Sequence, residues 1–193
     1  MTYFITEDDL APYINTTDLS VLDQNLNYWQ QISLAVIEEI RSYVGHRYDI
    51  TTDLRGLNLT AVNTGINCSV GARYYNTASK LHYICILDAT NQTLTNTTYF
   101  TQGDSRNQTV LMRFIDMVLY HLHAHITPQN VPTIRHERYD GNDPKQQGGA
   151  IGWLKMLQKG DVTTVLTVLV DDEGNEQGHR VTYGNVTRND YRR

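Results

Sequence analysis

Four histidines in the second half of the chain have the side chains best suited to metal or acid–base chemistry: His121, His123, His125 and His136. His121 and His125 lie one helical turn apart, a spacing that can place two zinc ligands on one helix face. No glutamate of the HExxH type lies between them, and no acid follows at a ligand spacing. We therefore predict polar positions near a helix end, where the helix dipole favours a protonated imidazole, and no metal site.

Two other patterns could bind ions or phosphates, and neither is complete. The acidic run DDEGN at 171–175 lacks the alternating oxygen donors and the final glutamate of a calcium loop. The glycines at 148–149 do not form a GxGxxG or GxxxxGK phosphate loop, and no GxSxG elbow is present. We therefore predict no enzyme and no cofactor. A metal-dependent hydrolase is a third, minor alternative, which predicts stoichiometric zinc and loss of activity in His121→Ala.

The composition is that of a folded protein without a general affinity for nucleic acid. The chain has 193 residues, 40% of them hydrophobic and 19% charged, which is enough for one domain with a core. Its formal net charge is -5, whereas binding to a phosphate backbone needs a clustered cationic surface. The first residues lack the basic start and apolar core of a signal peptide, and no apolar run is long enough to span a membrane. We therefore expect a protein that is made and used in a reducing cytoplasm. We expect Cys68 and Cys85 to stay reduced, because disulfide frameworks usually show more cysteines.

Three stretches have the period of amphipathic helices. Over 28–44, apolar side chains recur at three- and four-residue steps and Gly45 supplies a stop. A long helix is expected over 107–126 and a shorter one over 150–158, which ends at Gly160. Short helices are also expected from Thr6, a good N-cap, to about residue 14, and over 18–24.

The segment 49–105 has a different composition, rich in threonine, asparagine and glycine. Its β-prone runs predict a small sheet dominated by a hairpin at 82–101. A second hairpin is expected at 163–183, with its turn at 171–175. The fold class we predict is mainly α, a small helical bundle with a β-rich insertion and a C-terminal β-hairpin (α+β overall). Its parts are 1–48 and 106–160 for the helical domain, 49–105 for the insertion, and 161–193 for the hairpin and tail.

The order of four motifs resembles that of a virion family. The chain opens with YFITEDDL, its first long helix ends in IRSYVGHRY, and ERY precedes AIGWLKMLQKGDV after the second. Together they resemble the head–tail connector proteins of tailed bacteriophages, most closely the phage Mu-like head-completion branch. The resemblance covers about half of the chain, at 3–48 and 107–162. Two departures are the length of the insertion and the segment DGNDPKQQGG before Ala150.

The resemblance implies a structural function. Such connectors are helical bundles that assemble into a closed ring, commonly a dodecamer, in the neck of the virion. The ring joins the portal protein to the tail or to a second connector ring, and genomic double-stranded DNA passes through its channel without sequence-specific binding. In related connectors the C-terminal segment often docks on the portal, which here would involve Tyr191, Arg192 and Arg193.

Three aromatic residues are candidate contacts between subunits: Trp153, Tyr99 and Phe100. Trp153 lies at the edge of an apolar helix face, so it suits either the core between the last two long helices or the seam between subunits. The alternative function is a binding module whose 49–105 insertion recognises a carbohydrate or a host protein through its tyrosines and asparagines. That alternative predicts that deletion of 49–105 abolishes ligand binding and leaves folding intact.

Overall fold

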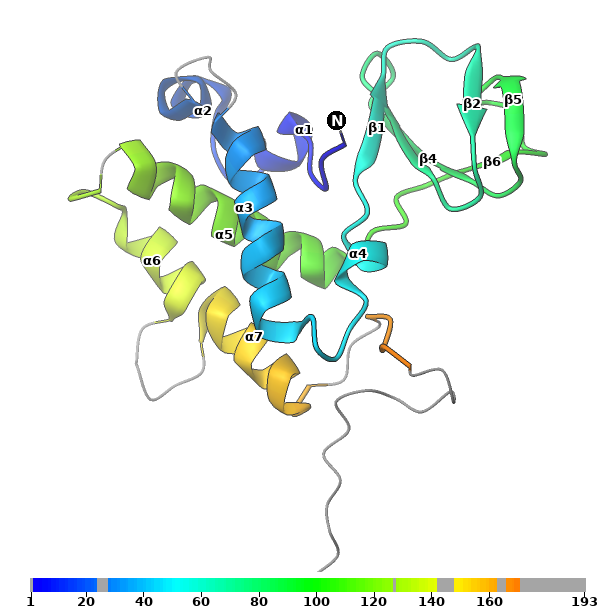
Figure 1. Ribbon diagram of the computed structural model, residues 1–193. Helices are drawn as coiled ribbons and strands as arrows, with labels where there is room; N and C mark the ends of the chain where they lie inside the picture. Colours follow the sequence, from blue (N-terminus) through cyan, green and yellow to red (C-terminus); the bar gives the residue numbers. More distant parts are fainter. Residues whose placement is uncertain (1, 24–27, 127, 142–147, 163–165, 171–193) are drawn as a thin grey trace, which may run out of the picture.

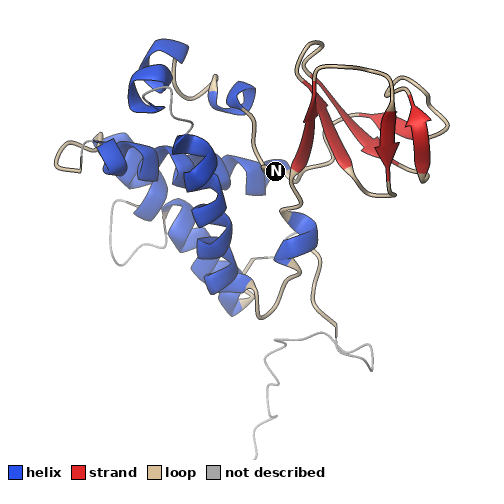
Figure 2. Cartoon of the chain, turned by 45° about the horizontal axis from the view of Figure 1, so that its top comes forward, coloured by secondary structure: helices blue, strands red, loops and turns tan. Residues whose placement is uncertain are grey.

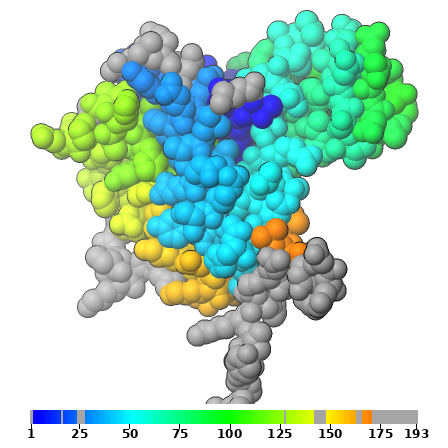
Figure 3. All heavy atoms as spheres, in the orientation of Figure 1, coloured from blue at the N-terminus to red at the C-terminus, as the bar shows by residue number. Residues whose placement is uncertain are grey.

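The protein consists of a helical body and a small sheet unit that protrudes from it (Figures 1 and 3). The computed structural model describes residues 2–23, 28–126, 128–141, 148–162 and 166–170. Within these ranges it has seven helices and six strands, 45% helix and 18% strand. The prediction of a mainly α, helical-bundle fold class is therefore wrong. The chain is an α+β mixture, because the short β-prone runs of the insertion pair into a four-stranded sheet with a core of its own.

The helical body contains every helix of the described chain: α1 (Glu7–Leu10), α2 (Thr16–Asp23), α3 (Tyr28–Val44), α4 (Ile50–Asp53), α5 (Gln108–Ile126), α6 (Thr133–Asp140) and α7 (Gly149–Lys159). The central helix is α5, which contacts α2, α3, α6 and α7. Its apolar stripe is broad, so it can be covered from several sides at once. The predicted helices at 28–44, 107–126 and 150–158 are confirmed, whereas α4 and α6 were not predicted.

Local sequence explains where these helices begin and end. Thr6 and Asp9 form a capping box at the start of α1, which satisfies two free backbone amides. Asn107 accepts hydrogen bonds from the first amides of α5. Gly160 ends α7 with a φ of 79°, a left-handed conformation in which glycine carries no steric penalty. For α2 the cap is Asn15, whose Oδ1 accepts from the Asp18 amide, so this helix begins before the expected residue 18.

The sheet unit contains the six strands: β1 (Leu57–Thr60), β2 (Ile66–Cys68), β3 (Arg73–Asn76), β4 (Leu81–Cys85), β5 (Ala89–Gln92) and β6 (Phe100–Gln102). One sheet has the order β1-β3-β4-β6, and β2 pairs with β5 in a second, two-stranded sheet. The β1–β3 pair is parallel, and the other pairs are antiparallel. The strands lie together at one end of the molecule in both views (Figures 1 and 2).

Two separate hydrophobic cores stabilise these parts. The larger one lies among the helices and includes Phe4 against Phe114, with ring centroids 5.0 Å apart. The smaller one lies in the sheet unit and is built around Tyr74 and Phe100, whose rings meet edge to face at 5.9 Å. The two cores share no residue, and polar contacts contribute much of what holds the sheet unit against the helices.

The chain beyond α7 returns to the helical body. Val168 forms an isolated β-bridge with Tyr48, and backbone hydrogen bonds join Asp49 to Thr167 and Leu169 to Arg47. Residues 166–170 thus lie beside the link between α3 and α4. The rest of the predicted hairpin at 163–183, including its acidic turn, lies outside the described residues.

Candidate functional site

Arg106 joins the sheet unit to the helical body. It stands between β6 and α5, and its side chain is only 1% exposed. The guanidinium donates hydrogen bonds of 2.8 and 2.9 Å to Asp9 and of 2.8 to 3.1 Å to Asp104. It also donates to the Phe4 carbonyl oxygen at 2.9 Å. One side chain therefore connects the N-terminal segment, the end of the sheet and the start of the longest helix.

The charges at this joint are strongly coupled. Burial lowers the pKa of Arg106, but the hydrogen bonds with Asp9 and Asp104 outweigh it and raise that pKa. Burial raises the pKa of Asp104, and the bonds from Arg106 reverse this and bring it to about 2. A buried charge is tolerated only when its partners satisfy it in this way. The joint is built to stay ionised and closed.

His82, on β4, completes the joint. Its Nε2 lies 3.3 Å from a guanidinium nitrogen of Arg106. That nitrogen already donates its two hydrogens to Asp9 and Asp104, so its contact with the imidazole is a close approach beside those bonds. The other ring nitrogen, Nδ1, is buried without a hydrogen-bond partner in the described chain. Burial and the charge of Arg106 lower the pKa of His82. The neutral form of this histidine is therefore favoured beside a permanent cation.

Two further contacts brace the sheet unit. Asp8, on α1, accepts hydrogen bonds from the Tyr75 hydroxyl and from Lys80. Arg73, at the start of β3, donates to the carbonyl oxygens of Asp53 and Arg55 at 3.2 and 3.1 Å. A cleft of about 310 Å³ lies here, and its lining is mainly polar: Asp53, Arg73, Asp104, Ser105, Arg106 and Asn107, with Val110 and Leu166. The joint is thus made of hydrogen bonds and ion pairs, with no shared apolar core.

The histidines of α5 are used in packing. His121 Nε2 lies 2.8 Å from Glu39 on α3, and the Tyr139 hydroxyl of α6 donates to the same carboxylate at 2.6 Å. Burial opposes ionisation of Glu39, but these two bonds outweigh it and lower its pKa. His125 meets the Tyr28 ring edge to face at 4.9 Å. Glu39 therefore ties three helices together.

His123 and His136 take separate positions. His123 Nδ1 lies 2.7 Å from the Leu119 carbonyl oxygen, one turn back on the same helix. His136 lies on α6 against the ring of Tyr120. Within the described residues no group of three or more histidine, cysteine or acidic side chains could hold a metal ion. The four histidines thus do not converge on one point.

Exposed apolar side chains gather in two places. The first, which we name the sheet patch, comprises Val70, Ile86, Leu87 and Asp88, beside the end of β4. Its three apolar side chains are 57%, 47% and 50% exposed. The second, which we name the α2–α6 groove, is a hollow of about 520 Å³. It is lined by Tyr13, Ile14, Asn15, Asp18, Val21, Leu22, His123, Pro132, Ile134 and Arg135.

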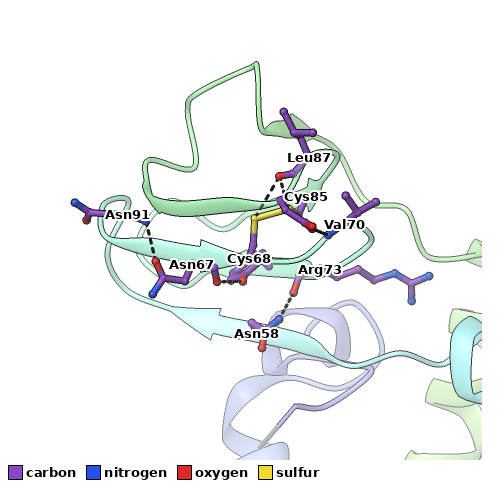
Figure 4. The surroundings of a disulfide bond; sticks show 10 residues. Asn58, Asn67, Cys68, Val70, Arg73, Cys85, Leu87 and Asn91 are labelled. Carbon is purple, nitrogen blue, oxygen red and sulfur yellow. Dashed lines mark hydrogen bonds between the residues drawn. A yellow bond between two sulfur atoms is a disulfide. The ribbon is translucent and has the colours of Figure 1, made fainter.

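The sheet patch is fixed by a disulfide between Cys68 and Cys85, which joins β2 to β4 (Figure 4). Our expectation that these cysteines stay reduced is therefore wrong: the pairing of the two sheets brings together residues separated by 17 positions. The Leu87 carbonyl oxygen lies next to both sulfurs, and the Val70 amide donates to Asp88 at 2.7 Å. The patch is thus a cross-linked surface and not a loose loop.

The structure places the predicted interface residues mostly inside the chain. Trp153 is 6% exposed in the helical core, which corresponds to the first of its two interpretations. Phe100 is 2% exposed in the sheet core, and Tyr99 is partly buried beside it. Of the three, only Tyr99 retains surface for a second subunit. The predicted portal-docking residues, Tyr191, Arg192 and Arg193, lie outside the described residues.

Sequence reasoning missed the groups that the fold brings together. Arg106 stands in an unremarkable SRN triplet, and Glu39 is one of two adjacent glutamates on α3. The one local signal was that Asp104 lies two positions before Arg106, a spacing at which the two side chains can form an ion pair. No local pattern indicates that Asp9 closes the site from 97 positions away.

Comparison with known proteins identifies no relative. No protein-family model, no curated protein and no solved structure matches this chain. Among the described helices, none combines the length and the apolarity needed to cross a membrane.

Proposed function

We propose that this chain is a structural head–tail connector of a tailed bacteriophage. It assembles as a homo-oligomeric ring in the virion neck, between the portal protein and the tail or a second connector ring, and extends the channel through which genomic DNA passes. The motif order of the sequence motivates this proposal, since no relative is identified. The structure contributes one observation in support.

That observation is a braced two-part molecule with an exposed apolar surface on each part. Arg106, Asp8 and Arg73 fix the sheet unit to the helices, so the two surfaces keep a constant separation. A protein that bridges two components needs a fixed separation between its two contact surfaces. With a flexible joint, the position of one component would not determine the position of the other. Exposed apolar clusters on a soluble protein are also typical of contact sites.

The overall charge agrees with a DNA channel. Passing DNA must slide, and strong cationic contacts would hold each phosphate. The formal net charge of -5 and the use of Arg106 and Lys80 in internal ion pairs both reduce such contacts.

Disruption of the gene in the phage tests the function. The expected result is DNA-filled or DNA-leaking heads and free tails that fail to join, with infectivity restored by the wild-type gene in trans. Normal particles that lack the protein would contradict the proposal. The alternative, a module that binds a carbohydrate or host protein through 49–105, predicts complete particles that no longer attach to the host.

A further inference from the structure

We infer that the sheet patch of one copy docks into the α2–α6 groove of the next copy, so that the ring grows head to tail. This inference rests on the proposed function and identifies the surfaces that its ring would use. Among the described residues, five of the ten large apolar side chains that are exposed lie in these two places, so a contact there would remove the most apolar surface from water.

The two surfaces have complementary shapes. The groove is concave, and its lining includes Val21 of α2 and Ile134 of α6, which are 65% and 50% exposed. The sheet patch is formed by two adjacent loop segments, where Leu87 and Val70 project close together beside the disulfide (Figure 4). A hollow with apolar walls and a projecting apolar surface can cover each other. Two grooves, or two sheet patches, would cover less apolar surface against each other.

The positions of the two surfaces favour a chain of contacts. The helices α2 and α6 lie at one end of the molecule, and the sheet unit lies at the other in both ribbon views (Figures 1 and 2). A contact between unlike surfaces at opposite ends leaves one of each free after every addition. Such heterologous contacts continue until the rotation between copies closes a ring.

Charge selects the same pairing. Because each copy carries a net charge of -5, copies repel one another unless their contact surfaces are locally complementary. In the groove, Arg135 is partly buried and donates to the Tyr13 carbonyl oxygen, and the carboxylate whose charge acts on it is that of Asp116. Arg138 and Arg113 act on the same carboxylate of Asp116, so positive charge is in excess around Arg135. Asp18, on α2, adds a negative charge to the groove lining, so an acidic partner group is favoured only beside Arg135.

The sheet patch supplies the matching anion. Asp88 is the one acidic residue between positions 57 and 103. Its Oδ1 accepts from the Val70 amide, and no described cation forms an ion pair with it. In the docked arrangement the Asp88 carboxylate faces Arg135 while Leu87 and Val70 enter the groove. A second copy of this chain therefore fits the groove in both apolar surface and charge.

Two single substitutions test the pairing, one on each surface. Ile134→Asp places a negative charge in the groove and leaves the sheet patch intact. Leu87→Asp does the reverse. Val62→Asp is the matched control, since Val62 is 57% exposed on the sheet unit but lies outside the patch. Circular dichroism and thermal melts verify that each variant folds, and the oligomeric state is measured by sedimentation velocity and native mass spectrometry on isotopically distinguishable proteins.

The head-to-tail arrangement predicts a specific mixing result. Wild type and Val62→Asp self-associate as concentration rises, and each test variant alone does so at least tenfold more weakly, a loss of about 1.4 kcal/mol or more. An equimolar mixture forms a capped one-to-one heterodimer, because the intact patch of Ile134→Asp enters the intact groove of Leu87→Asp.

Three results would overturn the inference. Wild type could remain monomeric at every concentration, either variant alone could form homodimers as a two-fold contact requires, or the mixture could fail to associate. None of these would remove the connector function, which is tested separately by the joining of heads to tails.

Discussion

Arg106 and Asp9 form a two-bond ion pair, at 2.8 and 2.9 Å, across 97 positions of the chain. The pair closes the joint between the sheet unit and the helices, and its arginine is buried. The proposed connector depends on this joint, because it keeps the sheet patch and the α2–α6 groove at a fixed separation.

Replacement of Arg106 by methionine is expected to destabilise the protein by roughly 3–5 kcal/mol, because it leaves two carboxylates without their cation. The matched control is Lys80→Met, whose ion pair with Asp8 is largely exposed and worth less than about 1 kcal/mol. Urea unfolding at neutral pH measures both. Equal losses in the two variants would show that burial of Arg106 does not matter.

The joint is also expected to weaken in acid. The pKa of His82 in the folded protein lies below its ordinary value of 6.5. As the pH drops below about 6.5, the imidazole is therefore protonated more readily in the unfolded chain than in the folded one, and the free energy of unfolding falls. Asp104, with a pKa of about 2 in place of 3.8, adds a second loss as pH falls from 3.8 towards 2. The groups that face His82 are Arg106, Asp104, Asp9 and Asp8, with the ring of Tyr75.

The variant His82→Gln separates these two losses. Glutamine keeps a polar side chain beside Arg106 and does not titrate, so the loss below pH 6.5 should shrink while the loss below pH 3.8 persists. Melting temperatures measured from pH 7.5 to pH 3 provide the comparison. A profile identical to that of wild type would mean that His82 does not contribute to the acid response.

Glu39 is expected to contribute more to the free energy of unfolding than its neighbour Glu38. The variant Glu39→Gln weakens the acceptor for His121 and Tyr139 at the meeting point of three helices, at a cost of about 1–3 kcal/mol. The variant Glu38→Gln changes an exposed i,i+3 pair with Arg41 and should stay within about 0.5 kcal/mol. Denaturant titration at pH 7.5 compares them. Similar values for both would show that the helices do not depend on this carboxylate.

The disulfide is expected to stabilise the sheet unit by roughly 3 kcal/mol, the value for closing a loop of this length in the unfolded chain. Wild type in reductant and the Cys68→Ala/Cys85→Ala variant should then unfold at similar, lower denaturant concentrations. Mass spectrometry after alkylation counts the free thiols. Two alkylated cysteines in protein kept under oxidising conditions would rule out the bond.

The sequence predicted the elements whose signals are local. Periodic apolar residues predicted α3, α5 and α7, and Thr6 predicted the start of α1. The helix α6 was missed because it has no buried residues and so no apolar period. The disulfide and the Arg106 joint were missed because each depends on how distant strands and helices pack together. No fixed spacing of residues in the sequence indicates such contacts.

Imaging of the neck in purified particles tests the central claim most directly. Electron cryomicroscopy with symmetry-free reconstruction, together with quantitative mass spectrometry, locates and counts the protein. We expect a ring of copies between portal and tail in which each sheet unit contacts the helices of its neighbour. Particles that are complete and infectious but contain no copy of this chain in the neck would contradict it.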